Sequence, residues 1–108
     1  MSTEPVQFWL KGWLSKQSRF LKKWRRRFVV LTNTQLLTYK DENINEAPTE
    51  KLSLKRCTAV KSADTQTQKL HSFCVHCGGN DYFFFAETAD EKDRWIGLIS
   101  GLISERAD

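Results

Sequence analysis

The chain has 108 residues, which is enough for one domain with its own core but not for two. Hydrophobic residues make up 40% and charged residues 28%, a balance that is ordinary for a globular protein and argues against a largely disordered chain. No apolar run approaches the roughly 18 residues of a membrane-spanning helix, and we find no signal peptide or lipidation motif. The cysteines, Cys57, Cys74 and Cys77, are odd in number and do not form a disulfide framework, so we expect a cytoplasmic protein.

The net charge of +4 conceals an uneven distribution of charge along the chain. Residues 11–27 contain eight basic side chains and no acidic one, whereas the rest of the chain has nine basic and thirteen acidic side chains. Such asymmetry is informative about partners rather than about the fold, and it predicts an anionic partner. The basic residues of this segment are Lys11, Lys16, Arg19, Lys22, Lys23, Arg25, Arg26 and Arg27.

Runs of alternating, β-branched and aromatic residues predict a β-rich domain after a polar, flexible tail at residues 1–7. Two polar stretches, 41–49 and 63–69, are expected to be loops, and Gly78-Gly79-Asn80 is a strong hairpin signal. Seven short strands at this spacing favour a sandwich or a barrel. The expected strands cover residues 8–16, 23–31, 35–40, 51–56, 57–62, 70–77 and 82–86.

The last predicted element is an amphipathic helix. Thr88 and Glu91 stand three residues apart, as the two partners of a capping box do, and they place the helix start. Five apolar residues then follow at the spacing of one helical face, so we expect this helix to pack on the β structure. They are Trp95, Leu98, Ile99, Leu102 and Ile103. The domain is therefore expected to span residues 8–104, followed by a short tail at 105–108.

Four segments in this order resemble the pleckstrin-homology (PH) domain family. They read GWLSK at 12–16, WRRRFVVL at 24–31, LTYK at 37–40 and ETADEKDRW at 87–95. The resemblance covers about residues 8–104 and is closest to the phosphoinositide-binding type, similar to the protein-kinase-B-like PH domains. It implies a mainly β fold: two near-orthogonal antiparallel sheets form a partly open, seven-stranded barrel, and the C-terminal helix plugs one end.

The resemblance also implies a headgroup site at the other end of the barrel, made of Lys16, Arg25, Arg27 and Tyr39. The residues themselves agree, because positions 25 and 27 of a strand project from one face while Arg26 projects from the other. Two guanidinium groups on one face can hold phosphates bidentately, and Lys16 adds a point charge. We include two further cations of the hairpin loop, Lys22 and Arg19, in the predicted site.

Between residues 70 and 91 the chain has only His71 and His76 where many relatives that prefer 3-phosphorylated lipids carry a late basic residue. Two hypotheses remain open for Phe20 and Leu21, at the expected tip of the hairpin. They either fold back onto the core or insert into a membrane.

The sequence therefore predicts a non-catalytic module that is recruited reversibly to membranes through phosphoinositides. No catalytic motif is recognisable, and no cofactor is expected. Cys74 and Cys77 form a Cys-x-x-Cys, but positions 74 and 77 of one strand face opposite ways, so we expect no metal there. A protein- or peptide-binding module on the same fold is the alternative, nucleic-acid binding is less favoured, and we expect a monomer.

Overall fold

The structure is a computed structural model that describes residues 5–106. The tails predicted at 1–7 and 105–108 therefore lie partly outside the described residues. Within the described residues, the N-terminal segment is held by hydrogen bonds to the turn between the second and third strands. The backbone of Gln7 forms two hydrogen bonds with Asn33. Gln7 N donates to the Asn33 side-chain oxygen at 3.0 Å, and the backbone amide of Asn33 donates to Gln7 O at 3.0 Å.

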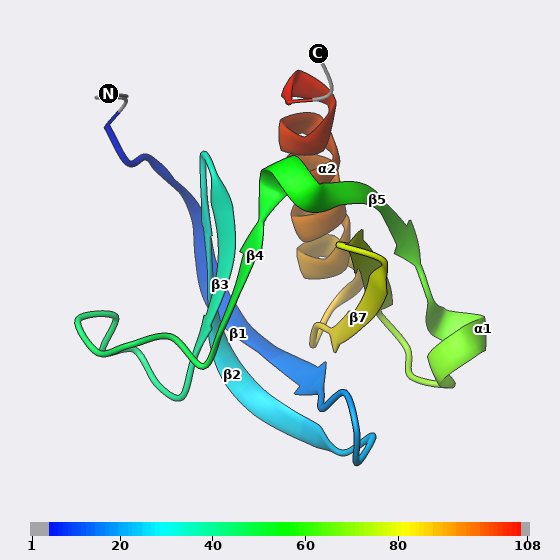
Figure 1. The fold of residues 1–108 in the computed structure, drawn as a ribbon. Helices are drawn as coiled ribbons and strands as arrows, with labels where there is room; N and C mark the ends of the chain where they lie inside the picture. The colour runs from blue at the N-terminus through cyan, green and yellow to red at the C-terminus, as the bar shows by residue number, and fades with distance from the viewer. Residues whose placement is uncertain (1–4, 107–108) are drawn as a thin grey trace.

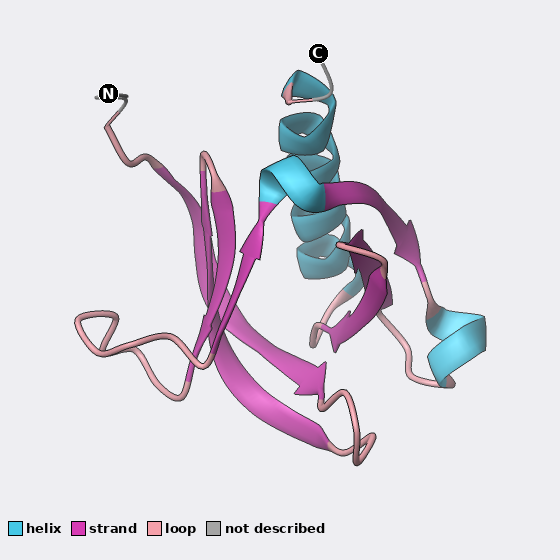
Figure 2. Cartoon of the chain, viewed as in Figure 1, coloured by secondary structure: helices cyan, strands magenta, loops and turns pink. Residues whose placement is uncertain are grey.

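All seven predicted strands form, and every pairing between them is antiparallel (Figures 1 and 2). They make a single hydrogen-bonded sheet in the order β4-β3-β2-β1-β7-β6-β5. The strands are β1 (Phe8–Gln17), β2 (Trp24–Thr32), β3 (Gln35–Tyr39), β4 (Glu50–Ser53), β5 (Cys57–Ser62), β6 (Ser72–Cys77) and β7 (Asn80–Phe85).

The sheet bends sharply where β1 passes from one half of it to the other. β1 pairs with β2 along its whole length but with β7 only at Ser15–Phe85 and Lys16–Phe84. β4 and β5 are the two edges, so the bent sheet stays open between them. Figure 1 shows β1–β4 on one side, and β5, β7 and the helix α2 (Ala89–Glu105) on the other. The predicted fold class, a mainly β, partly open seven-stranded structure with a C-terminal helix, is confirmed, and the two expected sheets are the two halves of one hydrogen-bonded sheet.

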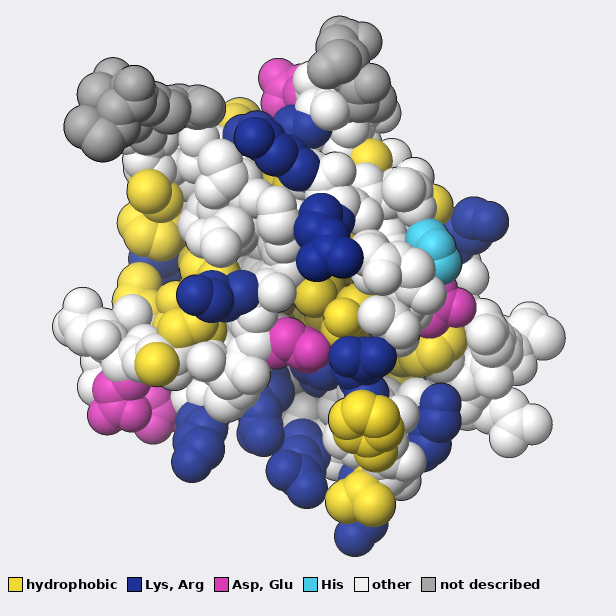
Figure 3. All heavy atoms as spheres, in the orientation of Figure 1, with side chains coloured by type: hydrophobic (Ala, Val, Ile, Leu, Met, Phe, Trp, Pro, Cys, Tyr) yellow, Lys and Arg dark blue, Asp and Glu magenta, His cyan; other side chains and the backbone are white. Residues whose placement is uncertain are grey.

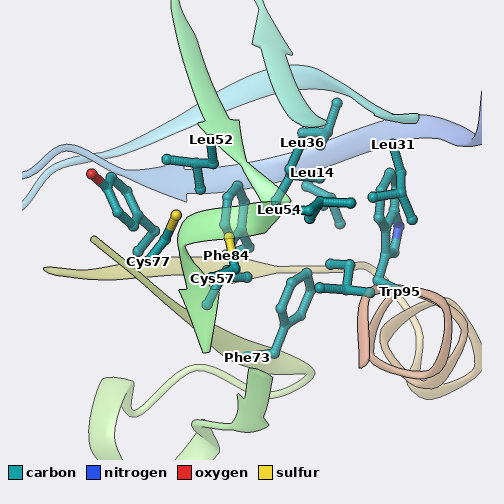
Figure 4. Close-up of a cluster of buried hydrophobic side chains, with 14 of the residues drawn as sticks. Leu14, Leu31, Leu36, Leu52, Leu54, Cys57, Phe73, Cys77, Phe84 and Trp95 are labelled. Carbon is teal, nitrogen blue, oxygen red and sulfur yellow. The ribbon is translucent and has the colours of Figure 1, made fainter. Parts of the chain in front are cut away.

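The helix α2 begins and packs as the sequence predicts. The amide of Glu91 donates to the Thr88 hydroxyl at 3.1 Å, which is the capping contact. Trp95 and two further residues of the stripe, Ile99 and Leu102, are buried in the main core, and Leu98 and Ile103 pack against it. Figure 4 shows the Trp95 ring between α2 and Leu31 of the sheet. The helix therefore fills the space between the halves of the bent sheet.

Three local features differ from the prediction. The strand expected at 51–56 ends at Ser53, and a 3₁₀ turn, η1 (Leu54–Arg56), follows. This turn carries the chain from the edge strand β4 to the edge strand β5, and it inserts Leu54, which is fully buried, into the core. The strand expected from residue 70 begins at Ser72, because His71 has a φ of +64°, which a strand cannot accommodate.

The stretch expected to be a loop at 63–69 contains one helical turn, α1 (Asp64–Thr67). The Asp64 carboxylate holds it in place by accepting from the amides of His71 and Ser72 and from the Lys92 ammonium at 2.9 Å. The Lys92 ammonium and these amides lower the pKa of Asp64 to about 2. Lys92 lies 28 residues along the chain from Asp64, so local pattern did not indicate the turn.

Replacement of Trp95 by Ala should destabilise the domain by about 3–5 kcal/mol, because it removes a large buried aromatic side chain and leaves a cavity. Trp95 is only 3% exposed, and its ring lies over Gly12 of β1. Urea unfolding measures the effect. The exposed neighbour Arg94 provides the control, and Arg94→Ala should unfold like the parent. An unchanged midpoint for Trp95→Ala would contradict the role assigned to the ring.

Candidate functional site

A cavity of about 210 Å³ opens on the concave face of the sheet, beside the loop that joins β1 to β2. Its lining combines four cations with hydroxyl groups and one carboxylate, and we call it the basic cup. The lining residues are Lys16, Ser18, Arg19, Arg25, Arg27, Thr38, Thr49 and Glu50.

The two-residue period of the strands explains why these side chains meet. On β2, Val29 and Leu31 are fully buried in the main core, and Arg25 and Arg27 continue the same face beyond it. On β1, Leu14 faces the core and Lys16 is the next residue on that face. The cup is therefore the continuation of the core face at the point where apolar residues give way to basic ones.

Lys16 is an enclosed cation of the cup. Its side chain is only 11% exposed, and its ammonium lies 2.5 Å from the Glu50 carboxylate. The ring of Tyr82, on β7, lies beneath two of the cations, with its centroid 5.7 Å from the Lys16 ammonium and 5.6 Å from the Arg19 guanidinium. Lys16 thus has a fixed position between a carboxylate and an aromatic face.

Arg25 and Arg27 reach the cup from β2, as predicted. Arg27 is half-buried and donates from Nη1 to the backbone oxygen of Arg26 at 3.1 Å, whereas Arg25 is exposed. Neither forms an ion pair with an acidic side chain within residues 5–106. Two guanidinium groups are therefore available to an incoming anion.

Arg26 projects from the opposite face of β2, as the alternation predicts. Its guanidinium lies 4.9 Å from the Trp13 ring centroid and 3.1 Å from the Glu87 carboxylate. Together with Trp13 and Glu87 it lines a separate cavity of about 290 Å³ between β1 and α2. Arg26 therefore offers a matched comparison for its two neighbours.

The loop between β1 and β2 carries both apolar and basic side chains into solvent. Phe20 is 88% exposed and Leu21 is 66% exposed, so the hypothesis that they fold back onto the core is wrong. Ser18 and Lys23 close the loop, because Ser18 N donates to Lys23 O at 2.7 Å and Lys23 N donates to Ser18 Oγ at 3.0 Å. Figure 3 shows Lys and Arg side chains gathered at the lower end of the molecule, where this loop lies in Figure 1, with hydrophobic side chains projecting among them.

Two predicted site residues lie outside the lining of the cup. Tyr39 packs beside Val30 and Leu37 in a second apolar cluster and is 8% exposed. It follows Thr38, which lines the cup, so the alternation directs it to the other face of β3. Lys22 is exposed at the tip of the loop, with a φ of +57°. The headgroup roles of both residues stay predictions.

The sequence did not indicate the remaining polar residues of the cup, nor the Tyr82 ring that lies against Lys16 and Arg19. Thr38 could have been found from its position two residues after Leu36, on the core face of β3. Thr49 and Glu50 precede the strand expected at residue 51 and stood in, or next to, a predicted loop. Ser18 and Tyr82 gave no sequence signal of their own.

The cysteines do not converge on one site. Cys77 lies in the core beside Cys57, and the two thiols donate to the Ser53 carbonyl at 3.5 and 3.4 Å. Cys74 faces a different cavity, where burial raises the pKa of its thiol to about 11. Within residues 5–106, no group of three or more His, Cys, Asp or Glu side chains is placed to hold a metal ion.

The sequence pattern of the PH domain family matches residues 10–104. The chain belongs to the PH domain family. Pleckstrin homology domain-containing protein 1 of Arabidopsis thaliana is 33% identical over 112 residues, which cover 96% of this chain and 77% of that protein. A human dual adapter for phosphotyrosine and 3-phosphotyrosine and 3-phosphoinositide is 28% identical over 88% of this chain but only 33% of its own length. This PH domain thus corresponds to about one third of the adapter.

Solved PH domains show the same arrangement of strands and helix. The Slm1 PH domain in complex with phosphoserine superimposes with a TM-score of 0.75 and 25% identity, over 88% of this chain and 94% of that one.

The described part of this PH domain, residues 5–106, contains no helix that is both long and apolar enough to cross a membrane.

Proposed function

We propose that this PH domain is a phosphoinositide-binding, membrane-targeting module that acts from the cytoplasm. The observation that supports this most strongly is the convergence of Lys16, Arg25 and Arg27 on one cup at the open side of the sheet. The cup binds the inositol phosphate headgroup, and the loop between β1 and β2 faces the membrane. The module binds without catalysing a reaction and needs no cofactor.

The chemistry of the cup suits phosphate esters. The planar guanidinium groups of Arg25 and Arg27 can each donate two parallel hydrogen bonds to phosphate oxygens. The hydroxyl groups of Ser18, Thr38 and Thr49 line the same cavity. The Ser18 hydroxyl can donate to phosphate, and the two threonine hydroxyl groups, which bond to each other, can accept from ring hydroxyl groups. A ligand that carries both phosphates and hydroxyl groups on a small ring matches this mixture.

Directed contacts are needed because diffuse attraction to an anionic membrane is weak. A Lys or Arg near the surface contributes about 1 kcal/mol, so four of the eight cations together give about 4 kcal/mol, which corresponds to about millimolar affinity. Salt screens that term readily. Bidentate contacts in a partly enclosed cup add affinity, and they reward the correct positions of the phosphates.

The exposed apolar residues fit the same orientation. Phe20 and Leu21 lie in the loop that also supplies Arg19 to the cup, so a membrane that presents the headgroup also meets these two side chains. Complete burial of such a side chain contributes about 1.5–3 kcal/mol. Insertion of two residues would strengthen membrane attachment and leave it reversible.

The comparisons support a phosphorylated ligand. The name of the human dual adapter includes 3-phosphoinositide, and the Slm1 PH domain was solved with phosphoserine, a phosphate ester. This chain is similar in sequence to the adapter and in fold to the Slm1 PH domain, and it presents its own basic cup.

Protein or peptide binding is the second candidate function, and one observation favours it. β1 pairs with β7 at only two positions, near its C-terminal end, so its first half is a strand edge facing α2. Phe8 and Trp9 are exposed on that half, and Trp9 lines a shallow cavity with Gly97 and Leu98 of the helix. A partner bound there would be insensitive to loss of Arg25 and Arg27.

Replacing Arg25 or Arg27 by Ala should abolish detectable binding of inositol 1,3,4,5-tetrakisphosphate and leave the fold intact, because both guanidinium groups face the cup rather than the core. Isothermal titration calorimetry measures the binding, and circular dichroism checks the fold.

Arg26→Ala is the matched control, because it removes the same charge from the opposite face of the same strand. It should weaken binding much less. Equal losses from all three substitutions would reduce the proposal to attraction by net charge, and undiminished binding by all three would place the site elsewhere.

Replacing both Phe20 and Leu21 by Ser should weaken binding to liposomes that contain phosphatidylinositol 3,4,5-trisphosphate. Binding of soluble inositol 1,3,4,5-tetrakisphosphate should be spared, because the soluble ligand offers no bilayer to insert into. Liposome sedimentation and calorimetry give the two values. The insertion hypothesis fails if liposome binding is unchanged or if both ligands weaken equally.

A further inference from the structure

The basic cup contains a carboxylate, which is unexpected in a site for phosphate. Glu50 lies at the start of β4, opposite Thr38 of β3, and its side chain is 25% exposed. It lines the cup together with the four cations and pairs with one of them, Lys16, across a distance of 2.5 Å. This carboxylate therefore contacts a cation that the proposed function assigns to the headgroup.

The backbone next to Glu50 is firmly held. Thr49 N donates to the carbonyl of Thr38 at 2.7 Å, and the two threonine hydroxyl groups lie 2.7 Å apart. The Thr49 hydroxyl also contacts the Thr38 carbonyl at 3.1 Å. This clasp fixes the start of β4, so the Glu50 carboxylate can leave the cup only by rotation of its own side chain.

Lys16 has equally little freedom. β1 pairs with β2 on one side and with β7 on the other at this residue, and Tyr82 lies beneath its ammonium. In the sheet, β2 and β3 separate β1 from β4, so the ion pair extends across the concave face of the first four strands. A phosphate that contacts Lys16 must therefore come close to Glu50 as well.

We propose that Glu50 is a specificity-determining residue of the cup, which competes with ligand phosphate for Lys16. This inference rests on the proposed function. A headgroup that places a phosphate beside Lys16 must break the ion pair between Lys16 and Glu50, and the Glu50 carboxylate repels that phosphate. A headgroup held only by Arg25 and Arg27 leaves the ion pair in place. The cost thus rises with the number of phosphates that enter the cup.

Removing this charge should therefore tighten binding, and most of all for the most highly phosphorylated ligand. Glu50→Gln keeps the size of the side chain and its capacity to accept hydrogen bonds. We expect its affinity for inositol 1,3,4,5-tetrakisphosphate to rise about tenfold, and its affinity for inositol 1-phosphate to rise less than about threefold. Calorimetry measures the first ligand, and titration of amide chemical shifts measures the weaker one.

Glu87→Gln is the charge-matched control, because Glu87 pairs with Arg26 outside the cup. It should leave both affinities unchanged. Glu50→Ala is a second test of the same charge and should reproduce the direction of Glu50→Gln, with thermal unfolding as the check on the fold.

Two results would overturn the inference while leaving the proposed function in place. The first is that Glu50→Gln and Glu50→Ala bind inositol 1,3,4,5-tetrakisphosphate no more tightly than the parent does. The second is an equal gain from Glu87→Gln, which would reduce the effect to net charge. A parent and Glu50 variants that bind neither inositol phosphate would overturn the proposed function and this inference with it.

Discussion

The register between β1 and β2 is the constraint on which both the core and the basic cup depend. With Gly12 opposite Val29 and Lys16 opposite Arg25, the face that buries Leu14, Val29 and Leu31 also presents Lys16, Arg25 and Arg27. A shift of β2 by one residue would take Val29 and Leu31 out of the main core and turn Arg26 into the cup. The burial that stabilises the domain therefore also fixes which arginines face the ligand.

The bend of the sheet gives this face two different uses. Where α2 covers it, Trp95 and the residues around it complete the main core (Figure 4). Beyond the core, the face is lined by cations and hydroxyl groups and stays open to solvent. The sheet carries Lys16, Arg25 and Arg27, and the exposed Phe20 and Leu21 lie in the adjoining loop between β1 and β2.

The sequence predicted the features that follow from local pattern. Period-two alternation indicated that Arg25 and Arg27 share a face that excludes Arg26, and the capping contact of Thr88 and the buried stripe of α2 were equally visible. Positive φ at Gly78 and Gly79 agrees with the hairpin signal. These features depend on residues that are neighbours in the chain or on one strand.

Features that join distant segments were beyond such reasoning. The turn α1 depends on contacts from Asp64 to Lys92 and Ser72, and η1 exists because the chain crosses between two sheet edges. Glu50 enters the cup only because β4 pairs with β3, and the sequence placed the start of this strand at residue 51, after a loop at 41–49. Tyr39 was assigned from the resemblance to the family, whereas the alternation on β3 turns it away from the cup.

The central claim is that the cup recognises a phosphoinositide headgroup and does not merely attract negative charge. Competition between liposomes of equal total charge tests it most directly, with phosphatidylinositol 3,4,5-trisphosphate or 3,4-bisphosphate in one set and phosphatidylserine in the other, at about 0.15 M and about 0.5 M salt. We expect the domain to bind the phosphoinositide liposomes in preference to the phosphatidylserine liposomes at both salt concentrations. Equal competition by phosphatidylserine, or a collapse of binding to every lipid together at the higher salt concentration, would contradict it.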